Sequence, residues 1–555
     1  MANIINKNDE FELEIDDIGV EGEGIAHKDG YALFIKDAIP GDFVRIKVIK
    51  AKKNYGYGRL LEVLKPSEDR VEPVCPVARQ CGGCQIQHLS YEAQLSYKEN
   101  KIKNCLIRLG GFSKEQIALV MEPILGMETP YHYRNKAQFP VGRSREGELV
   151  TGFYASRTHS IIPMMNCAIQ DKRNEEILDI VMRVMRAYQI EPYDEVAHKG
   201  VVRHVLTRIG HHTGEIMVCF VINGNALPHA DKFIEQLTVL EGMKSISINR
   251  NKEKTNVILG DQVKTIWGKD YIVDYIGSIK YQISPLSFYQ VNPIQTQKLY
   301  QTALDFAGLT GKEIVWDLYC GIGTISLFLA QKAKMVYGVE IVPEAIADAN
   351  RNKAFNNIKN VEFFVGASEV ILPEKYKESN GQMTADVIVV DPPRKGCDRT
   401  LLDTILNMKP QKIVYVSCDP ATLARDLKML CEGGYELKRV RGCDMFGHTG
   451  HVETVCLLSK LHEAKHHVNV RLDMDELDIT SAESKATYEE IKAYVAEHHD
   501  GLKVSNLYIA QVKAKYGIIE RENYNKAKSD DARRPKCPKE KEEAIVEALK
   551  FFQMI

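Results

Sequence analysis

The hydrophobic and polar positions of the first 64 residues alternate with the two-residue period of β-strands. Three segments show this alternation, with Gly and Asp at the turns between them: FELEIDDIGV, GYALFIKDAIPGDFVRIKVIK and YGRLLEVLK. The pattern predicts a small β domain from about Phe11 to Leu64, of the five-stranded OB-like barrel type. Basic residues interleaved with tyrosines suit phosphate contacts and base stacking with RNA, although a solvated basic hairpin has the same composition: Lys47, Lys50, Lys52, Lys53, Tyr55, Tyr57 and Arg59.

A second pattern, in which strands alternate with helices, begins near Gly311 and predicts a parallel sheet. Its first elements are the strand Ile314–Leu318, the loop Tyr319–Gly323, the helix Thr324–Lys332 and the strand Met335–Val339. Gly321 and Gly323 permit close approach of a ligand to the backbone, and Glu340 is placed to bind both hydroxyls of a ribose. The loop lacks the third glycine of the dinucleotide-binding fingerprint.

Three more polar side chains stand where strands of this second pattern end or begin. They are Asp391, after the strand Val387–Val390; Cys418, after the strand Ile413–Ser417; and Glu453, at the start of the last strand. Asp419 and Pro420 predict a helix that begins just after Cys418, and a helix N-terminus favours the thiolate. Taken alone, Cys418 is explained as well by packing. Ligands bind at the carboxyl edge of such a sheet, however, where the glycine loop, Glu340, Asp391 and Cys418 all lie.

Between these two patterns, residues 122–283 alternate strands and helices less regularly. Two groups of side chains on predicted strands suggest a phosphate-binding face, although ordinary surface charge explains any one of them: Arg134, Asn135, Lys136 and Arg143, and Arg203, His204 and Arg208. Phe288, Tyr289 and Gln290 then precede a helix. An aromatic ring next to an amide suits the binding of a planar ligand.

The composition describes a cytosolic globular chain of several domains. The 555 residues are 44% hydrophobic, and their net charge of −2 restricts any nucleic-acid contact to local patches. The sequence contains neither an apolar signal segment nor a run long enough to span a membrane. In the cytosol, the 13 cysteines do not indicate a disulfide framework; clustered ones indicate metal binding.

One such cluster is CPVARQCGGC, with Cys75, Cys81 and Cys84. Three thiolates need a fourth ligand, for which Cys167 in PMMNCAIQD is the candidate. Four thiolates suit either zinc or an iron–sulfur cluster. Because zinc ribbons pair two short C-x2-C knuckles and the second is missing here, the spacing favours a [4Fe–4S] cluster.

Four motifs in a fixed order carry a family resemblance: YCGIGT, DPPRKG, SCDPATLARD and HVETV. With the cysteine cluster, the chain resembles the RNA 5-methyluridine methyltransferases, specifically the iron–sulfur branch that acts on 23S ribosomal RNA. The segment around GEGIAHKDGYALFIKDAIPGD resembles the TRAM domain. The implied fold is multidomain: a TRAM-like β-barrel (1–66), a central α+β domain with the iron–sulfur site (67–285), a Rossmann-like α/β methyltransferase domain (286–461) and a helical tail of unknown role (462–555).

The resemblance implies roles for individual residues. Cys418 attacks carbon 6 of uracil, carbon 5 then takes a methyl group from S-adenosylmethionine, and Glu453 removes the carbon-5 proton. Cofactor-binding positions are Gln290, Tyr319, Gly321, Gly323, Glu340 and Asp391; substrate-binding positions are Arg134, Phe288 and Asp391; cluster ligands are Cys75, Cys81, Cys84 and Cys167. The expected partner is RNA, most simply 23S rRNA bound by a cytoplasmic monomer.

Three alternatives stay open. Transfer RNA could be the substrate instead of ribosomal RNA. An amino-methylating enzyme would use the D-P-P loop without the cysteine nucleophile. A non-catalytic iron–sulfur RNA-binding protein would retain the cysteines but no activity.

Overall fold

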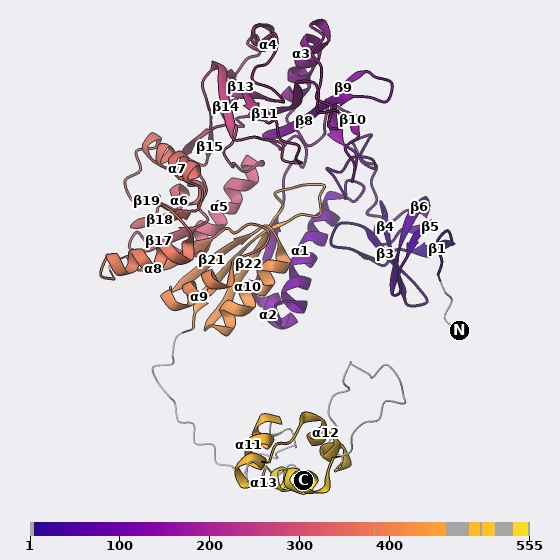
Figure 1. Ribbon diagram of the computed structural model, residues 1–555, viewed down its shortest axis with the longest axis vertical. Helices are drawn as coiled ribbons and strands as arrows, with labels where there is room; N and C mark the ends of the chain where they lie inside the picture. The colour runs from indigo at the N-terminus through magenta and orange to yellow at the C-terminus, as the bar shows by residue number, and fades with distance from the viewer. Residues whose placement is uncertain (1–4, 382, 462–487, 500–501, 517–536, 553–555) are drawn as a thin grey trace. The chain divides into compact units, whose positions relative to one another are not determined.

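The computed structural model describes residues 5–381, 383–461, 488–499, 502–516 and 537–552. They form two compact units, 1–463 and 464–555 (Figure 1). No helix among these residues is long and apolar enough to cross a membrane.

The N-terminal domain is a sheet of six strands in the order β1-β5-β6-β4-β3-β2. The strands are β1 (Glu10–Glu14), β2 (Asp17–Ile18), β3 (Gly24–Lys28), β4 (Tyr31–Lys36), β5 (Phe43–Ala51) and β6 (Tyr55–Lys65). Alternate side chains fill one apolar core, as the sequence pattern predicts. The sixth strand, β2, was not expected because two residues are too short to show a period.

Tyr55 and Tyr57 of β6 lie beside Phe34 of β4, with ring centroids 5.8 to 5.9 Å apart. Both tyrosines are exposed. The predicted aromatic surface of this domain therefore exists as a cluster of three rings on neighbouring strands.

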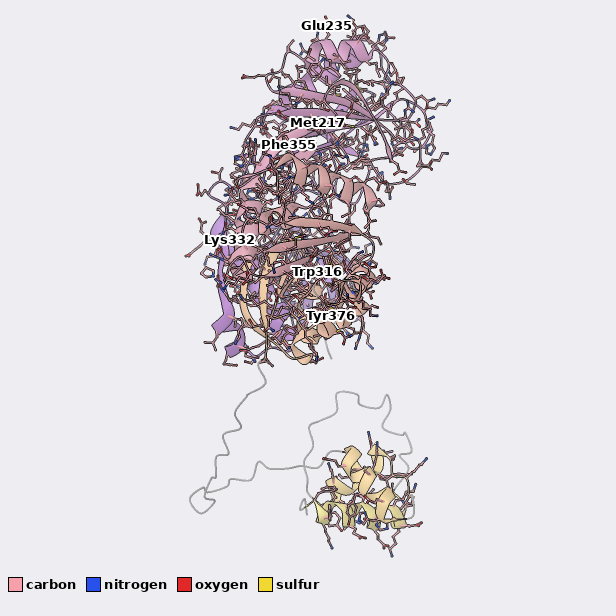
Figure 2. All side chains as sticks on the ribbon, turned by 90° about the vertical axis from the view of Figure 1, so that its left-hand side faces the viewer. Met217, Glu235, Trp316, Lys332, Phe355 and Tyr376 are labelled. Carbon is pink, nitrogen blue, oxygen red and sulfur yellow. The ribbon has the colours of Figure 1, made fainter. Side chains whose placement is uncertain are left out.

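The central region is a seven-stranded sheet, β10-β9-β8-β11-β12-β13-β14, packed against two helices. Its elements are β8 (Lys136–Arg143), β9 (Leu149–Tyr154), β10 (Ile161–Pro163), α3 (Arg173–Ala187), β11 (Val202–Ile209), β12 (Ile216–Ile222), α4 (Ala230–Leu237), β13 (Met243–Arg250) and β14 (Gln262–Gly268). The hairpin β15 (Ile272–Ile276) and β16 (Ile279–Ile283) follows. Met217 of β12, labelled in Figure 2, belongs to the core that this hairpin shares with the next domain.

The C-terminal part of the first unit is an eight-stranded sheet, β19-β18-β17-β20-β21-β23-β22-β7, in which β23 is antiparallel to both neighbours. Its elements are α5 (Pro293–Ala307), β17 (Ile314–Leu318), α6 (Thr324–Leu329), β18 (Met335–Glu340), α7 (Pro343–Phe355), β19 (Val361–Val365), α8 (Ser368–Glu378), β20 (Val387–Val390), α9 (Arg399–Met408), β21 (Lys412–Ser417), α10 (Pro420–Glu432), β22 (Tyr435–Cys443) and β23 (Glu453–Lys460).

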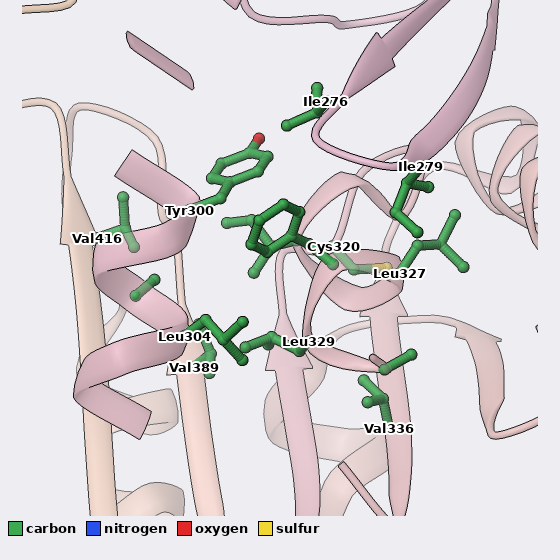
Figure 3. Close-up of a cluster of buried hydrophobic side chains, with 14 of the residues drawn as sticks. Ile276, Ile279, Tyr300, Leu304, Cys320, Leu327, Leu329, Val336, Val389 and Val416 are labelled. Carbon is green, nitrogen blue, oxygen red and sulfur yellow. The ribbon is translucent and has the colours of Figure 1, made fainter. Parts of the chain in front are cut away.

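The central strand β20 of this sheet, VIVV, is apolar throughout because both faces are covered. Val389 and Val416 enter one core, which they share with Tyr300 and Leu304 of α5 (Figure 3). Their neighbours along the strands, Ile388 and Tyr415, enter the core on the other face. Trp316 of β17, labelled in Figure 2, is also fully buried there.

One segment of the sequence-predicted central domain belongs to this sheet instead. The helices α1 (Tyr91–Arg108) and α2 (Lys114–Val120) lead to β7 (Met121–Leu125), which is parallel to β22 at the sheet edge. Ile102 and Leu106 of α1 enter the same core as α10. The pairing partners are about 320 residues apart, so no local pattern could show them.

The second unit contains α11 (Tyr488–His498), α12 (Asn506–Lys515) and α13 (Lys539–Phe551). Ile491, Ile509 and Ile545 contribute one residue from each helix to its core. All three helices lie within the segment that the sequence predicts to be a helical tail. Most of the basic stretch between α12 and α13 lies outside the described residues.

Candidate active site

The candidate chemical groups meet at one edge of the eight-stranded sheet. The parallel strands β17, β18, β20 and β21 all end there. Cys418 directly follows β21, and Asp391 directly follows β20. Because β23 is antiparallel to β21 and their last pair is Ser417 with Thr454, Glu453 comes next to Cys418 in the register. Strand polarity thus brings together residues that are 35 positions apart.

The turn that carries Cys418 forms as the sequence predicts. Asp419 caps α10, and its carboxylate accepts from the backbone N–H groups of Ala421 at 2.8 Å and Thr422 at 3.3 Å. The Thr422 hydroxyl donates to the carbonyl of Arg394 at 3.2 Å, which ties the loop after β20 to the first turn of α10.

The surroundings of Cys418 outweigh the effect that the helix N-terminus was expected to have on its thiolate. Burial and the carboxyl groups of Glu453 and Asp391 raise the pKa of the thiol to about 12, against a smaller opposing effect of Arg394. A helix N-terminus supplies only a partial positive charge, and here two nearby acids outweigh it. Arg394 stands in DPPRKG three positions after Asp391, but the motif alone does not indicate this effect on the thiol.

The two acids have raised pKa values themselves. Burial raises the pKa of Glu453, which is only 4% exposed, to about 8, and Asp391 adds to that shift. Burial raises the pKa of Asp391 to about 7. No hydrogen bond to either carboxyl group is found among the described residues, although Glu453 is buried and Asp391 is half-buried. Perturbed, unpaired acids beside a thiol are typical of a reactive site.

The glycine loop after β17 folds back onto the end of β18. The backbone N–H groups of Tyr319 and Cys320 both donate to the carbonyl of Val339 at 3.0 Å, and that of Gly321 donates to Glu340 Oε2 at 3.2 Å. Tyr319 and Gly321 have positive φ angles of 72° and 55°. A side chain at Gly321 would meet no protein atom within 4 Å, so the loop leaves open space beside Glu340.

Asp317 lies behind this loop at the end of β17. It is fully buried, and its Oδ2 accepts a 2.5 Å hydrogen bond from Ser326 of α6, whereas Oδ1 has no partner. Burial raises the pKa of Asp317 to about 7. Asp317 is therefore a second acid at this loop, after Glu340, and its Oδ1 atom can still accept a hydrogen bond.

The segment before α5 separates its three candidate residues. Phe288 is 71% exposed, whereas Tyr289 is buried in the core. The backbone carbonyl of Gln290 accepts from Asn135 Nδ2 at 3.0 Å. Tyr289 consequently packs and does not bind a ligand, and Phe288 is the aromatic ring available to a partner.

The expected phosphate-binding face on β11 is wrong. Arg203, His204 and Arg208 are buried. Arg203 donates to the carbonyls of Asn251 and Glu253 at 2.9 Å, and Arg208 donates to the carbonyl of Ser287. Because both faces of β11 are covered, its arginine side chains bind the carbonyl groups of loops and do not reach solvent.

The four cysteines of the predicted cluster line one cavity of about 370 Å³: Cys75, Cys81, Cys84 and Cys167. Arg134 also lines this cavity, and its positive charge lowers the pKa of the Cys84 thiol. Burial and the other cysteines raise that pKa to about 12. Within the described part of the chain, no three His, Cys, Asp or Glu side chains are grouped so that they could hold a metal ion.

Comparison with known proteins agrees with this architecture. Residues 90–461 match the family profile described as tRNA (Uracil-5-)-methyltransferase, and residues 6–61 match the TRAM domain. An uncharacterized RNA methyltransferase of Halalkalibacterium halodurans is 54% identical over 82% of this chain and 98% of its own length. One of Clostridium tetani is 49% identical over 83% and 98%.

Among solved structures, the Pyrococcus abyssi tRNA (uracil-54, C5)-methyltransferase in complex with S-adenosyl-L-homocysteine is similar, with a TM-score of 0.65 and 28% identity. The match covers 80% of this chain and 99% of that one. The family profile alone spans two thirds of the chain, including every group at the sheet edge. The chain therefore belongs to the family of RNA uracil-5-methyltransferases, with a TRAM domain at its N-terminus.

Proposed function

We propose that this protein transfers a methyl group from S-adenosylmethionine to carbon 5 of a uridine in 23S ribosomal RNA, through a covalent bond between Cys418 and carbon 6. The observation that carries the proposal is the adjacency of Cys418 and Glu453 across β21 and β23, with Asp391 beside them. This set supplies a nucleophile and a base on the same side of one substrate.

The reaction needs the nucleophile because carbon 5 of uracil is a weak nucleophile on its own. The Cys418 sulfur forms a bond to carbon 6, and the electron pair of the 5,6 double bond becomes an enolate whose carbon 5 can accept a methyl cation. Arg394 lowers the pKa of the Cys418 thiol and so favours its deprotonation. S-adenosylmethionine supplies the methyl group as an electrophile.

The adduct must then lose the proton that carbon 5 still carries. Glu453 accepts this proton, the electron pair restores the 5,6 double bond, and the bond to Cys418 breaks. A carboxylate with a pKa of about 8 is a stronger base than an ordinary glutamate, which suits the task. Asp391, with its unpaired carboxyl group, is the candidate to hold an edge of the uracil ring.

The cofactor site is proposed at the glycine loop. Gly321 would let the backbone approach the cofactor, Gly323 lets the same loop pack closely against Phe363, and Glu340 would bind the ribose hydroxyls. Tyr319 would contact the adenosine, and Gln290 would complete the site from the segment before α5. The open space beside Gly321 supports this assignment. Phe288, exposed on the same segment, is proposed to stack on the extruded base, with Arg134 nearby as a phosphate or base contact.

We also propose a [4Fe–4S] cluster on Cys75, Cys81, Cys84 and Cys167. The cavity that these four side chains line supports it. The C-x5-C-x2-C spacing without a second short knuckle favours the cluster over zinc. None of the catalytic steps above involves it.

The iron content tests this proposal. Anaerobically purified protein should contain about four irons per chain, and Cys84→Ser should lose them. Cys105→Ser on α1 is the matched control and should keep them. Stoichiometric zinc without iron in the wild-type protein would refute the cluster.

The substrate is tested separately. Unmodified transcripts of 23S rRNA and of transfer RNA are incubated with the protein and S-adenosylmethionine, and 5-methyluridine is mapped by mass spectrometry. We expect modification of the 23S transcript. The named substrate of the Pyrococcus abyssi relative makes transfer RNA the second candidate, and modification of that transcript alone would establish it.

The mechanism is tested at Cys418. Cys418→Ala should abolish both methyl transfer and any covalent RNA complex, because it removes the sulfur that is proposed to bond to carbon 6. Cys431→Ala on α10 is the control and should retain activity. Full activity of Cys418→Ala would contradict the covalent mechanism and favour amino methylation.

A further inference from the structure

Glu453 stands at the end of a long loop that other parts of the protein hold. Residues 444–452, here called the hairpin loop, connect β22 to β23 and end directly before Glu453. Pairing of β23 with β21 stops at Thr454, and on its other side Glu453 pairs with Cys443, the last residue of β22. The hairpin loop therefore starts and ends at one cross-strand pair, so contacts that hold the loop also act on the position of Glu453.

Helix α1 forms hydrogen bonds with the first half of the hairpin loop. Asp444 is fully buried, and its carboxylate accepts from Lys98 Nζ at 2.5 Å and from the Tyr91 hydroxyl at 2.8 Å. Lys98 Nζ also donates to the carbonyl of Phe446 at 3.0 Å. Breaking a buried ion pair of this kind is costly, because one charge would stay buried without a partner.

His448 connects the hairpin loop to the cysteine-bearing segment. Its carbonyl accepts from the backbone N–H groups of Gln85 at 3.0 Å and Ile86 at 3.1 Å, which directly follow Cys84. Its own N–H donates to Gln94 Oε1 at 2.9 Å, and its ring Nδ1 lies 3.2 Å from Gln94 Nε2. The residue is buried and has a φ of 66°, a conformation that only outside contacts can maintain.

We infer that His448 is a positioning residue for Glu453, and that the backbone after Cys84 and the side chain of Gln94 hold it there. The inference rests on the proposed role of Glu453 as the base. It connects the cysteine segment to the catalytic edge, because only the four loop residues 449–452 separate His448 from Glu453. Loss of order around Cys84 should therefore slow proton removal more than methyl transfer.

The test separates these two steps. Gln94→Met removes both hydrogen bonds to His448 with little change of side-chain volume. Tyr133→Phe is a smaller change, which removes the 3.1 Å hydrogen bond from the Tyr133 hydroxyl to the carbonyl of Gly447. Lys103→Met is the control on α1, because Lys103 pairs with Glu99 and does not contact the hairpin loop. Each protein is mixed with S-adenosylmethionine and a 23S transcript that contains uridine or 5-fluorouridine.

With 5-fluorouridine, carbon 5 carries no proton to remove, so the rate of adduct formation reports only the steps before Glu453 acts. We expect both variants to form this adduct within about twofold of the wild-type rate. With uridine, Gln94→Met should turn over roughly tenfold to a hundredfold more slowly, as for a misplaced catalytic group, and should accumulate the methylated Cys418 adduct. Tyr133→Phe should show a smaller effect in the same direction.

Equal slowing on both transcripts, or slow turnover without adduct accumulation, would overturn the inference, because a general loss of structure would produce either. Glu453→Gln serves as the reference for a missing base. If Glu453→Gln turns over normally on the uridine transcript, the proposed function fails instead, whatever the behaviour of Gln94→Met.

Discussion

Replacing Glu453 by Gln should make the protein's stability less dependent on pH. The same change should stop the release of methylated RNA from Cys418. Burial raises the pKa of Glu453 from 4.5 to about 8. The folded protein therefore keeps this proton up to a higher pH than the unfolded chain does. As the pH rises from about 4.5 to about 8, the unfolded chain loses the proton first, and the free energy of unfolding falls.

One unit of pKa shift corresponds to about 1.4 kcal/mol, so the wild-type protein should lose about 3 kcal/mol of stability between pH 5 and pH 8 through Glu453. Gln has the same shape but no proton to lose. The difference between the melting temperatures at pH 5 and pH 8 should therefore be smaller by a few degrees in Glu453→Gln than in the wild-type protein.

Scanning calorimetry of the first unit's transition in the full chain measures this difference. Glu436→Gln is the matched control: it changes an exposed glutamate on β22 and should follow the wild-type curve. If the melting temperatures of the wild-type protein and Glu453→Gln change equally between pH 5 and pH 8, Glu453 does not have the raised pKa. Burial would then not make this residue a stronger base.

Two further changes test the ligand contacts. Glu340→Gln should weaken the binding of S-adenosylmethionine roughly tenfold to a hundredfold by calorimetry, because a charged acceptor of hydrogen bonds becomes neutral; affinity equal to that of the control Glu344→Gln would remove Glu340 from the site. Tyr57→Ala should weaken binding of a 23S transcript by about 1–3 kcal/mol in a fluorescence titration, through loss of one stacking ring, and should leave cofactor binding unchanged. Unchanged RNA affinity would show that the aromatic cluster on β4 and β6 is not a binding surface.

Local patterns were sufficient for much of the sheet edge. The strand β20 and the cap at Asp419 were predictable because burial on both faces and a helix start leave signs within a few residues. The shared edge of Glu340, Asp391 and Cys418 followed from the direction of parallel strands. The convergence of the cysteines was likewise an inference from spacing, and the cavity that they line agrees with it.

Properties that depend on distant neighbours were not predictable. The helix N-terminus beside Cys418 suggested a stabilised thiolate, but burial and then the surrounding acids shift the pKa of the thiol in the opposite direction. Arg203 and Arg208 looked like surface cations because charge in a sequence says nothing of what covers a strand.

The sequence by itself indicated the candidate residues and the strands that present them, because hydrophobic period, caps and motifs are local. The tertiary structure alone decided what surrounds each group. Lys98 and Asp444 are 346 positions apart in the chain yet share a buried hydrogen bond, and the cysteine segment reaches His448 across a similar span. Burial and contact between distant segments set pKa values and loop conformations, and these arise only when the whole chain is folded.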